Sequence, residues 1–222
     1  AHDLVGRFFM DHPYFFPGYF KAKSPDFNVN DFVIRDYAAV GHEQRSHLAL
    51  SLDEETRRRE GLNGAALYLV RRDKYKTLPE YMSRGGLALN HLIDVLRHRE
   101  SPISVSATDV TDLLGGFGDA AKTLGRQLGS LAHRQMVPGM RVALEVTPCR
   151  NSRVVLNDQK DRFGMPRVDV DWQLNERDRL GYYRLLDVLR REFSSRELGE
   201  FITHDSVDET GWPLAMTGGK HH

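Results

Sequence analysis

The stretch of sequence that decides the fold is RVALEVTPCRNSRVVLNDQKDRFGMPRVDVDW, residues 141–172. Apolar and polar residues alternate over 141–146 and again over 168–172, with a short apolar run at 154–156 between them. Alternation with a period of two is the pattern of a strand that has one solvated face. The connection from Asn157 to Pro166 is too short for a helical crossover. We therefore expect three strands in an antiparallel sheet.

A helix is predicted directly after this sheet. Asn175 is suited to cap its N-terminus, because a short polar side chain accepts a hydrogen bond from the first free backbone amides. Leu186, Leu189 and Phe193 recur at helical spacing and give one apolar side, while arginines occupy the other. We expect this helix to lie across the sheet.

Upstream of the sheet the pattern is mixed. Residues 13–40 are rich in aromatic residues and interrupted by proline and glycine, which predicts short strands separated by turns. The charged segment 52–62 predicts an exposed helix in which acidic and basic residues pair at three- and four-residue spacing. The apolar run 65–70 contains aromatic and β-branched residues, which favours a strand.

Two further helical regions are expected in the middle of the chain. Leucines and other apolar residues recur at three- and four-residue steps over 78–99, with a break or bend near Gly85-Gly86. The second region runs over 108–131, with Ser106 or Thr108 as its cap. No internal repeat is present. The fold class predicted is one α+β unit, an antiparallel β-sheet flanked by helices.

Composition excludes several classes of partner. The chain has 222 residues with 31 Lys and Arg against 31 Asp and Glu, so its formal net charge is zero and it has no overall positive field for nucleic acid. No apolar run approaches the ~20 residues that span a bilayer, so no membrane span is expected. The single Cys149 excludes an intrachain disulfide. The cellular compartment stays open.

Two separated parts of the sequence resemble the glucose-methanol-choline (GMC) family of FAD-dependent oxidoreductases. The first is LVGRFFMDHP at 4–13. The second is an ordered series formed by the strand 151–156, the turn 161–168 with its Asp, aromatic, Gly, X, Pro pattern, and the helix entry 172–178. The resemblance implies that residues 14–217 form the substrate-binding domain, that 1–13 adjoin an FAD domain, and that 218–222 begin the catalytic segment.

The resemblance also implies that this chain is part of a longer protein. It starts without Met and ends at GGKHH, just before the point where the family continues with Gly-Thr. The dinucleotide fingerprint Gly-X-Gly-X-X-Gly is absent, since Gly115-Gly116-Phe117-Gly118 has neither its spacing nor a preceding strand. We expect FAD to bind fully only in the parent protein, and the isolated chain to be inactive.

The site residues follow from the same resemblance. His221 occupies the position of the catalytic base, because a neutral imidazole near pH 7 accepts the proton of an alcohol while a hydride passes to the flavin. Gly6, Asp11, His12 and His222 occupy cofactor-side positions, whereas Phe8 departs from the family pattern. The implied substrate is an alcohol, polyol or sugar. The electron acceptor, and the choice between dehydrogenase and oxidase, stay open.

Alternative interpretations accompany these expectations. His221 and His222 are also consistent with the beginning of an affinity tag or a frayed terminus, and His12 with a turn residue that Asp11 satisfies. A function of another class is a non-catalytic α+β domain whose sheet face, lined near Trp172 and the aromatic residues of 14–20, binds a ligand or partner.

The remaining reactive side chains have structural explanations. Two histidine pairs are spaced within one segment each but lack a third ligand, so no metal site is predicted. Two aspartates alternate with apolar residues and are interpreted as the solvated face of a strand rather than as paired catalytic carboxylates. The thiol is interpreted as packing. These residues are His42 and His47, His91 and His98, Asp169 and Asp171, and Cys149.

Overall fold

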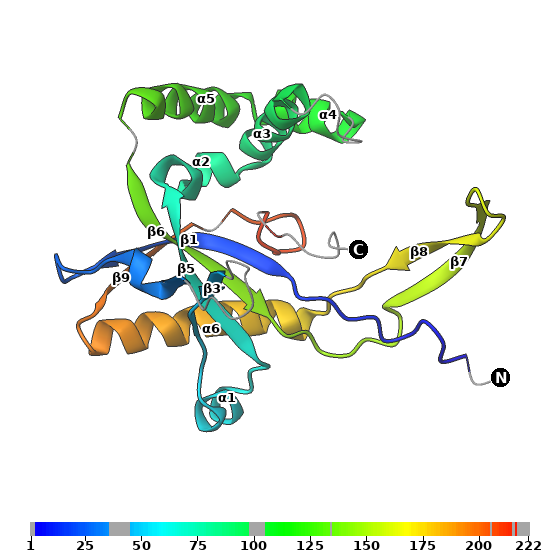
Figure 1. Ribbon diagram of the computed structural model, residues 1–222, viewed down its shortest axis with the longest axis horizontal. Helices are drawn as coiled ribbons and strands as arrows, with labels where there is room; N and C mark the ends of the chain where they lie inside the picture. The colour runs from blue at the N-terminus through cyan, green and yellow to red at the C-terminus, as the bar shows by residue number, and fades with distance from the viewer. Residues whose placement is uncertain are drawn as a thin grey trace.

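The computed structural model describes residues 3–35, 45–97, 105–133, 135–204, 206–214 and 216. Its centre is a five-stranded antiparallel sheet in the order β4-β5-β6-β1-β9 (Figure 1). The strands are β1 (Tyr14–Ala22), β4 (Ala49–Leu50), β5 (Ala65–Asp73), β6 (Met136–Leu144) and β9 (Gly199–Thr203). The N-terminal strand thus lies between strands from the second half of the chain. The predicted α+β class with an antiparallel sheet is confirmed.

β1 differs from the short strands and turns that the sequence predicts for 13–40. It is one strand of nine residues, and its pairing with β6 is irregular between Phe15 and Gly18. Pro17 lies in this irregularity, where its missing N–H does least harm to the ladder. On the side of β9, His204 holds this part of β1, because its backbone amide donates to the Pro17 carbonyl at 3.0 Å and its Nε2 lies 2.9 Å from the Phe16 carbonyl. A proline inside the pattern therefore bends the strand without ending it.

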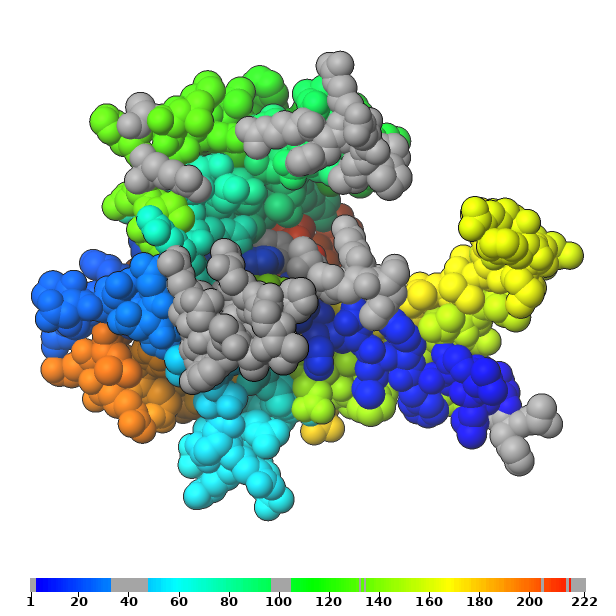
Figure 2. All heavy atoms as spheres, viewed as in Figure 1, coloured from blue at the N-terminus to red at the C-terminus, as the bar shows by residue number. Residues whose placement is uncertain are grey.

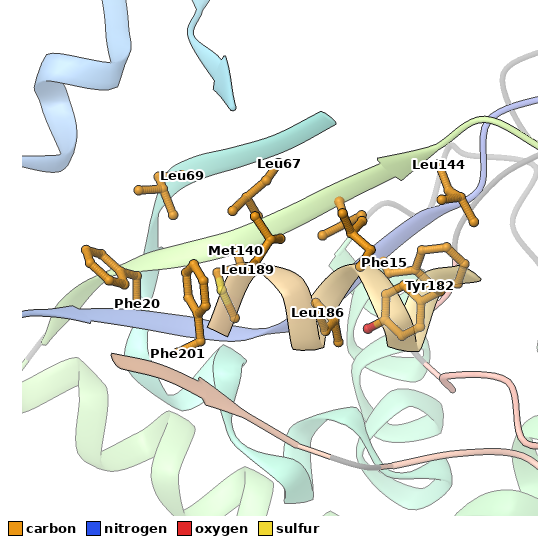
Figure 3. Packing of buried hydrophobic residues seen from close by; sticks show 12 residues of the cluster. Phe15, Phe20, Leu67, Leu69, Met140, Leu144, Tyr182, Leu186, Leu189 and Phe201 are labelled. Carbon is orange, nitrogen blue, oxygen red and sulfur yellow. The ribbon is translucent and has the colours of Figure 1, made fainter. Parts of the chain in front are cut away.

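Helix α6 (Glu176–Ser195) covers one face of the sheet. Its first turn is closed by a capping box, in which Asn175 accepts from the amide of Asp178 and Asp178 accepts from the amide of Asn175. Figure 3 shows side chains of the sheet and of α6 meeting in one hydrophobic core. Each large side chain buried here contributes roughly 1.5–3 kcal/mol to stability. The core residues are Phe15, Phe20, Leu67, Leu69, Met140, Val142, Leu144, Tyr182, Leu185, Leu186, Leu189 and Phe201.

A group of helices connects β5 to β6 and lies beyond the ends of these two strands (Figure 1). They are η2 (Lys74–Thr77), α2 (Pro79–Met82), α3 (Arg84–Arg97), α4 (Ala107–Gly115) and α5 (Phe117–Ala132). The break predicted near Gly85-Gly86 occurs at Ser83, between α2 and α3. The helical region 108–131 is two helices divided at Gly116, and Ser106 rather than Thr108 is the cap.

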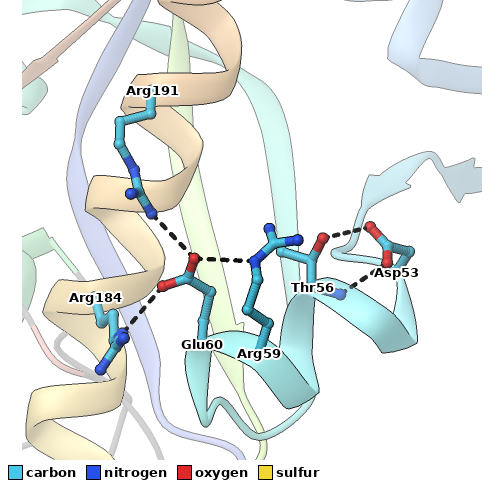
Figure 4. A network of polar contacts seen from close by, with 6 residues as sticks. All are labelled: Asp53, Thr56, Arg59, Glu60, Arg184 and Arg191. Atoms are coloured by element: carbon cyan, nitrogen blue, oxygen red, sulfur yellow. Dashed lines mark hydrogen bonds and ion pairs between the residues drawn. The ribbon is translucent and has the colours of Figure 1, made fainter.

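The short charged helix α1 (Glu54–Glu60) confirms the prediction for 52–62, with Asp53 as N-cap and Gly61 as C-cap. Glu54 and Arg58 pair on its surface at 2.5 Å. Figure 4 shows how its last residue joins it to α6: the Glu60 carboxylate accepts from Arg184 at 3.2 Å and from Arg191 at 3.3 Å. Hydrogen bonding by Arg184, together with the charge of Arg191, lowers the pKa of Glu60.

The prediction of a single three-stranded sheet over 141–172 is wrong in one respect. β6 belongs to the central sheet, whereas β7 (Arg153–Lys160) and β8 (Pro166–Asp171) form a separate two-stranded sheet. This hairpin projects from the body of the molecule beside the N-terminal segment (Figure 2). The expected buried side of the strand is open, since Val168 is 57% and Val170 46% exposed. Period-two alternation identifies a two-faced strand but not the element that covers its apolar face.

Three small elements complete the described part of the chain. η1 (Val29–Phe32) packs near β5, and β2 (Val33–Arg35) pairs antiparallel with β3 (Arg45–His47).

Candidate functional site

The N-terminal segment lies along the base of the β7–β8 hairpin. The amide of Val154 donates to the carbonyl of Gly6 at 2.7 Å, and the amide of Phe9 donates to the carbonyl of Ser152 at 2.9 Å. Arg7 and Arg153 form an isolated antiparallel bridge between these two contacts. The two sequence segments that carry the family resemblance, about 140 residues apart, are thus held together by main-chain hydrogen bonds.

Gly6 is required by this contact. Its backbone φ is +77°, a left-handed conformation that residues with a side chain rarely adopt. A Cβ atom at this position would lie 2.1 Å from the carbonyl oxygen of Val154. The close approach at Gly6 is therefore to the hairpin. Phe8, which departs from the family pattern, also has a positive φ of 58° and is 43% exposed.

Asp11 and His12 follow just before β1. The Asp11 carboxylate accepts from the backbone amide of His12 at 2.7 Å, and the His12 Nδ1 lies 3.3 Å from the carbonyl oxygen of Leu144. Asp11 is half-buried, whereas His12 is exposed. This arrangement holds the His12 ring against the end of β6, and it agrees with the turn-residue interpretation without testing a role next to a flavin.

His221 and His222 lie outside the described residues, as does the whole segment 218–222. The segment before them, 206–214, is a compact loop. The Asp208 carboxylate accepts from the amides of Thr210 and Trp212 at 2.8 and 3.0 Å, and the Tyr183 hydroxyl donates to the Gly211 carbonyl at 2.9 Å. These bonds hold the loop 206–214, which precedes the C-terminal histidines in the chain, against α6.

Trp212 anchors the same loop to the core. Its ring stacks on that of Phe15 with centroids 6.1 Å apart and an interplanar angle of 7°. Trp172 lies elsewhere, after β8 at the base of the hairpin, so it does not line the face of the central sheet. Its indole Nε1 is buried without a hydrogen-bond partner among the described residues.

Asp178 lies in the first turn of α6, within the segment 172–178 of the sequence resemblance, and it links three parts of the chain. Its side chain is 2% exposed. One carboxylate oxygen accepts from the amide of Thr147 at 2.8 Å and from the Asn63 side chain at 3.5 Å. The other oxygen closes the capping box of α6. The role supported by this geometry is structural, because a buried carboxylate surrounded by donors fixes their positions.

The aromatic residues of β1 divide between the two faces of the sheet. Phe15 and Phe20 face α6 in the core, whereas the half-buried Tyr14 and Phe16 carry the guanidinium groups of Arg141 and Arg72 at 4.1 and 4.3 Å from their ring centroids. The sequence reasoning missed these arginines, because an arginine that alternates with apolar residues is ordinarily a solvent-facing residue. The sequence feature that could have indicated this placement of the arginines is the pair of aromatic residues at alternate positions of β1.

An apolar cleft of about 610 Å³ opens where β1, η1 and the C-terminal end of α6 meet. Charged side chains are present in its lining, and it contains no histidine. Its lining residues are Phe20, Lys23, Ser24, Phe27, Phe32, Leu50, Leu69, Phe193, Arg196, Glu197 and Leu198.

The other titratable candidates are not brought together into one cluster in the described ranges. His91 Nδ1 lies 2.8 Å from Asp109 Oδ1 and so links α3 to α4, while His42 and His98 lie outside the described residues. Asp169 accepts from Asn157 at 2.8 Å on the exposed hairpin. No group of three or more metal-ligating side chains occurs among the described residues.

Comparisons with family models, with curated proteins and with solved structures found no match to this chain. Over the residues that the structure describes, no helix combines the length and apolar character needed to cross a bilayer. The geometry above and the resemblance of the sequence are therefore the grounds for a functional proposal.

Proposed function

We propose that this chain is the substrate-binding part of a GMC-type flavoprotein that oxidises an alcohol, polyol or sugar. The observation that supports the proposal best is the direct pairing of residues 6–9 with residues 152–154. The resemblance rests on these two segments, and an accidental likeness at two distant places in the sequence gives no reason for them to be neighbours in space.

The fit of an FAD group to the described residues is partial. The chain lacks the glycine-rich dinucleotide fingerprint, and Gly6 is used for contact with the hairpin. Asp11 and His12 remain as polar residues at the junction of the N-terminal segment and the sheet, and the resemblance adds His222 on the cofactor side. When bound, the flavin would supply the acceptor for the hydride. Most of the contacts to it would come from other parts of the parent protein.

The chain's own chemical contribution in this proposal is proton removal. His221 would accept the hydroxyl proton of the substrate, since an imidazole with a pKa near 6.5 is largely neutral at pH 7. The face of the sheet opposite α6 would form a wall of the substrate pocket and exclude water from it. General-base catalysis of this kind is worth roughly 10²–10⁴ in rate.

The test is made on the complete gene product. It should copurify with a flavin, visible by its absorbance, and an added polyol should bleach the oxidised flavin. His221→Ala should slow this reduction by roughly 10²-fold or more, whereas His133→Ala, at the C-terminal end of α5, should leave it unchanged. A flavin-free protein, or equal reduction rates in the wild type and His221→Ala, would contradict the proposal.

A second candidate is the non-catalytic ligand-binding domain. The observation that favours it is the sheet face with Tyr14, Phe16, Arg72 and Arg141, which does not depend on any residue beyond 216. Ligand binding without flavin and without turnover would support this candidate instead.

A further inference from the structure

Two guanidinium groups lie on the face of the central sheet that is turned away from α6. Arg141 extends from β6, and its Cζ is 4.1 Å from the centroid of the Tyr14 ring. Arg72 extends from β5, and its Cζ is 4.3 Å from the centroid of the Phe16 ring. Tyr14 and Phe16 are alternate residues of the neighbouring strand β1, so both cations rest on one row of aromatic rings.

Arg72 reaches this row because Gly139 has no side chain. Gly139 lies on β6, between β5 and β1, and pairs with Val70 on one side and Tyr19 on the other. A Cβ atom at Gly139 would be 2.9 Å from the Cβ and 3.2 Å from the Cδ of Arg72. The glycine thus opens a path along which the arginine crosses a whole strand and places its charge over Phe16, two residues along β1 from the ring that carries Arg141.

Neither guanidinium forms an ion pair within the described ranges of the chain. This contrasts with the α1–α6 junction, where Glu60 alone engages Arg59, Arg184 and Arg191. Both Arg72 and Arg141 are half-buried, and the Nε of Arg141 is fully buried without a hydrogen-bond partner among the described residues. Removing positive charge from water without a counter-charge is costly, and ring faces offset only part of that cost.

The pKa values of Arg72 and its neighbour Tyr81 reflect this cost of burial. Burial lowers the pKa of the Arg72 guanidinium, and the neighbouring Tyr81 and Tyr75 act in the opposite direction. Burial also raises the pKa of Tyr81. Arginine nevertheless stays protonated at any ordinary pH, so this face of the sheet presents permanent positive charge in an environment built from aromatic rings.

We propose that Arg72 and Arg141 form an oxyanion-binding subsite that selects substrates carrying a carboxylate or phosphate group. Guanidinium groups match the planar pair of oxygens of such anions with two parallel hydrogen bonds. Tyr14 and Phe16 hold the two forks in place and supply an apolar surface beside them. The inference rests on the proposed function, because only there is the bound molecule a substrate. It narrows the substrate class from neutral polyols to acidic sugars.

The first experiment measures binding rather than turnover. The full chain is titrated by calorimetry with three six-carbon probes: gluconate, which carries a carboxylate, glucose 6-phosphate, and the neutral polyol glucitol. Charge-assisted hydrogen bonds predict that at least one anion binds about tenfold or more tighter than glucitol. The stronger of the two anions identifies the group that the subsite accepts. Equal affinity for all three probes, or no binding of either anion, overturns the proposal.

Variants assign the effect to the two arginines. Arg141→Gln and Arg72→Gln should each weaken binding of the preferred anion by about tenfold or more while leaving glucitol binding unchanged. Arg141→Lys keeps the charge but not the fork, so it should recover only part of the affinity. Arg71→Gln is the matched control, since it removes the same charge from an exposed neighbouring position of β5 and should have no effect. Retained anion affinity in folded Arg141→Gln overturns the proposal.

A further variant tests the path of Arg72 without changing any charge. Gly139→Ala should displace the Arg72 guanidinium from Phe16 and weaken anion binding as much as Arg72→Gln does. Unchanged anion affinity in this variant shows that the position of Arg72 is irrelevant and removes it from the subsite. Because all these readouts are independent of flavin, a flavin-free protein that still prefers the anion refutes the proposed oxidation alone. A flavin-reducing protein without that preference refutes the subsite alone.

Discussion

At the scale of single residues, Gly6 and Gly164 separate two reasons for a glycine. Their backbone φ angles are nearly equal, at +77° and +79°. Gly164 lies in the turn of the hairpin, where a Cβ would meet nothing within 4 Å, whereas a Cβ at Gly6 would meet the Val154 carbonyl at 2.1 Å. Gly164 is therefore needed only for its backbone conformation, and Gly6 also for the space that its neighbour occupies.

This difference predicts unequal costs for the same substitution. Gly164→Ala should lower the free energy of unfolding by about 1–2 kcal/mol, the strain of a left-handed alanine. Gly6→Ala carries this strain and the clash, so it should cost about 1 kcal/mol more or detach the N-terminal segment locally. Urea denaturation gives the first quantity, and faster hydrogen exchange of the Val154 amide reports the second. Equal denaturation midpoints together with a protected Val154 amide in Gly6→Ala would show that the contact is unimportant.

At the scale of elements, the starts of two helices could be predicted from the sequence, because capping is local. Asn175 and Ser106 each stand directly before a helix and make the expected side-chain bonds. The partner of the β7–β8 hairpin was not predictable, since alternation in the sequence contains no information on which sheet a strand joins. The arginine pair was hidden for a related reason: whether Arg141 meets water or Tyr14 depends on strand β1, more than a hundred residues away.

The open hairpin predicts a contrast between two identical changes. Val142 is fully buried in β6, whereas Val170 in β8 is 46% exposed. Val142→Thr places a hydroxyl in the core and should cost about 1–3 kcal/mol. Val170→Thr should change the free energy of unfolding by less than about 0.5 kcal/mol. Chemical denaturation measures both. A large cost at Val170 would mean that its apolar face is covered in solution.

The junction of α3 and α4 should respond to acid. The Ser106 hydroxyl, the Ser106 amide and His91 all donate to the Asp109 carboxylate, and these bonds lower the pKa of Asp109 to about 2. In the unfolded chain the same group has a pKa of about 3.9. Its ionised form therefore stabilises the fold above about pH 4, and this contribution is lost as the pH falls toward 2.

The expected result is a pH-dependent difference between the wild type and Asp109→Asn. The gap in their free energies of unfolding should be largest near pH 5 and should narrow between about pH 4 and pH 2. Asp119→Asn, which removes an exposed carboxylate from α5, is the control and should show a much smaller gap throughout. Urea titrations at several pH values provide the measurement, and a gap that is constant over this range would contradict the assignment.

At the scale of the whole molecule, the sheet joins the two ends of the described chain. β1 pairs with β6 on one side and with β9 on the other, so the first strand keeps one free edge until the last strand is added. Phe20 of β1 packs against Phe201 of β9 and Phe193 of α6, with ring centroids 5.3 Å apart in both cases. Contacts over such sequence separations close long loops and form late in folding.

Removing β9 should therefore cause the chain to associate with other copies of itself. A chain that ends at residue 198 exposes the edge of β1 and the ring of Phe20, which is a template for pairing with other chains. Light scattering should detect oligomers of this variant at concentrations where the full chain is monodisperse. A synthetic peptide of residues 199–216 should reverse the effect by restoring the strand. A truncated chain that remains monodisperse would show that β9 is dispensable.

The main-chain bonds between the N-terminal segment and the hairpin have a mechanical consequence. The amides of Val154 and Phe9 each donate a hydrogen bond to the other segment. We therefore expect the hairpin and the N-terminal segment to move together as one unit. The connection 145–152 joins this unit to the central sheet, and in it the Thr147 amide donates a hydrogen bond to Asp178 at the start of α6. A force on the tip of the hairpin is thus transmitted to the first turn of α6, the helix that packs against the sheet in the core.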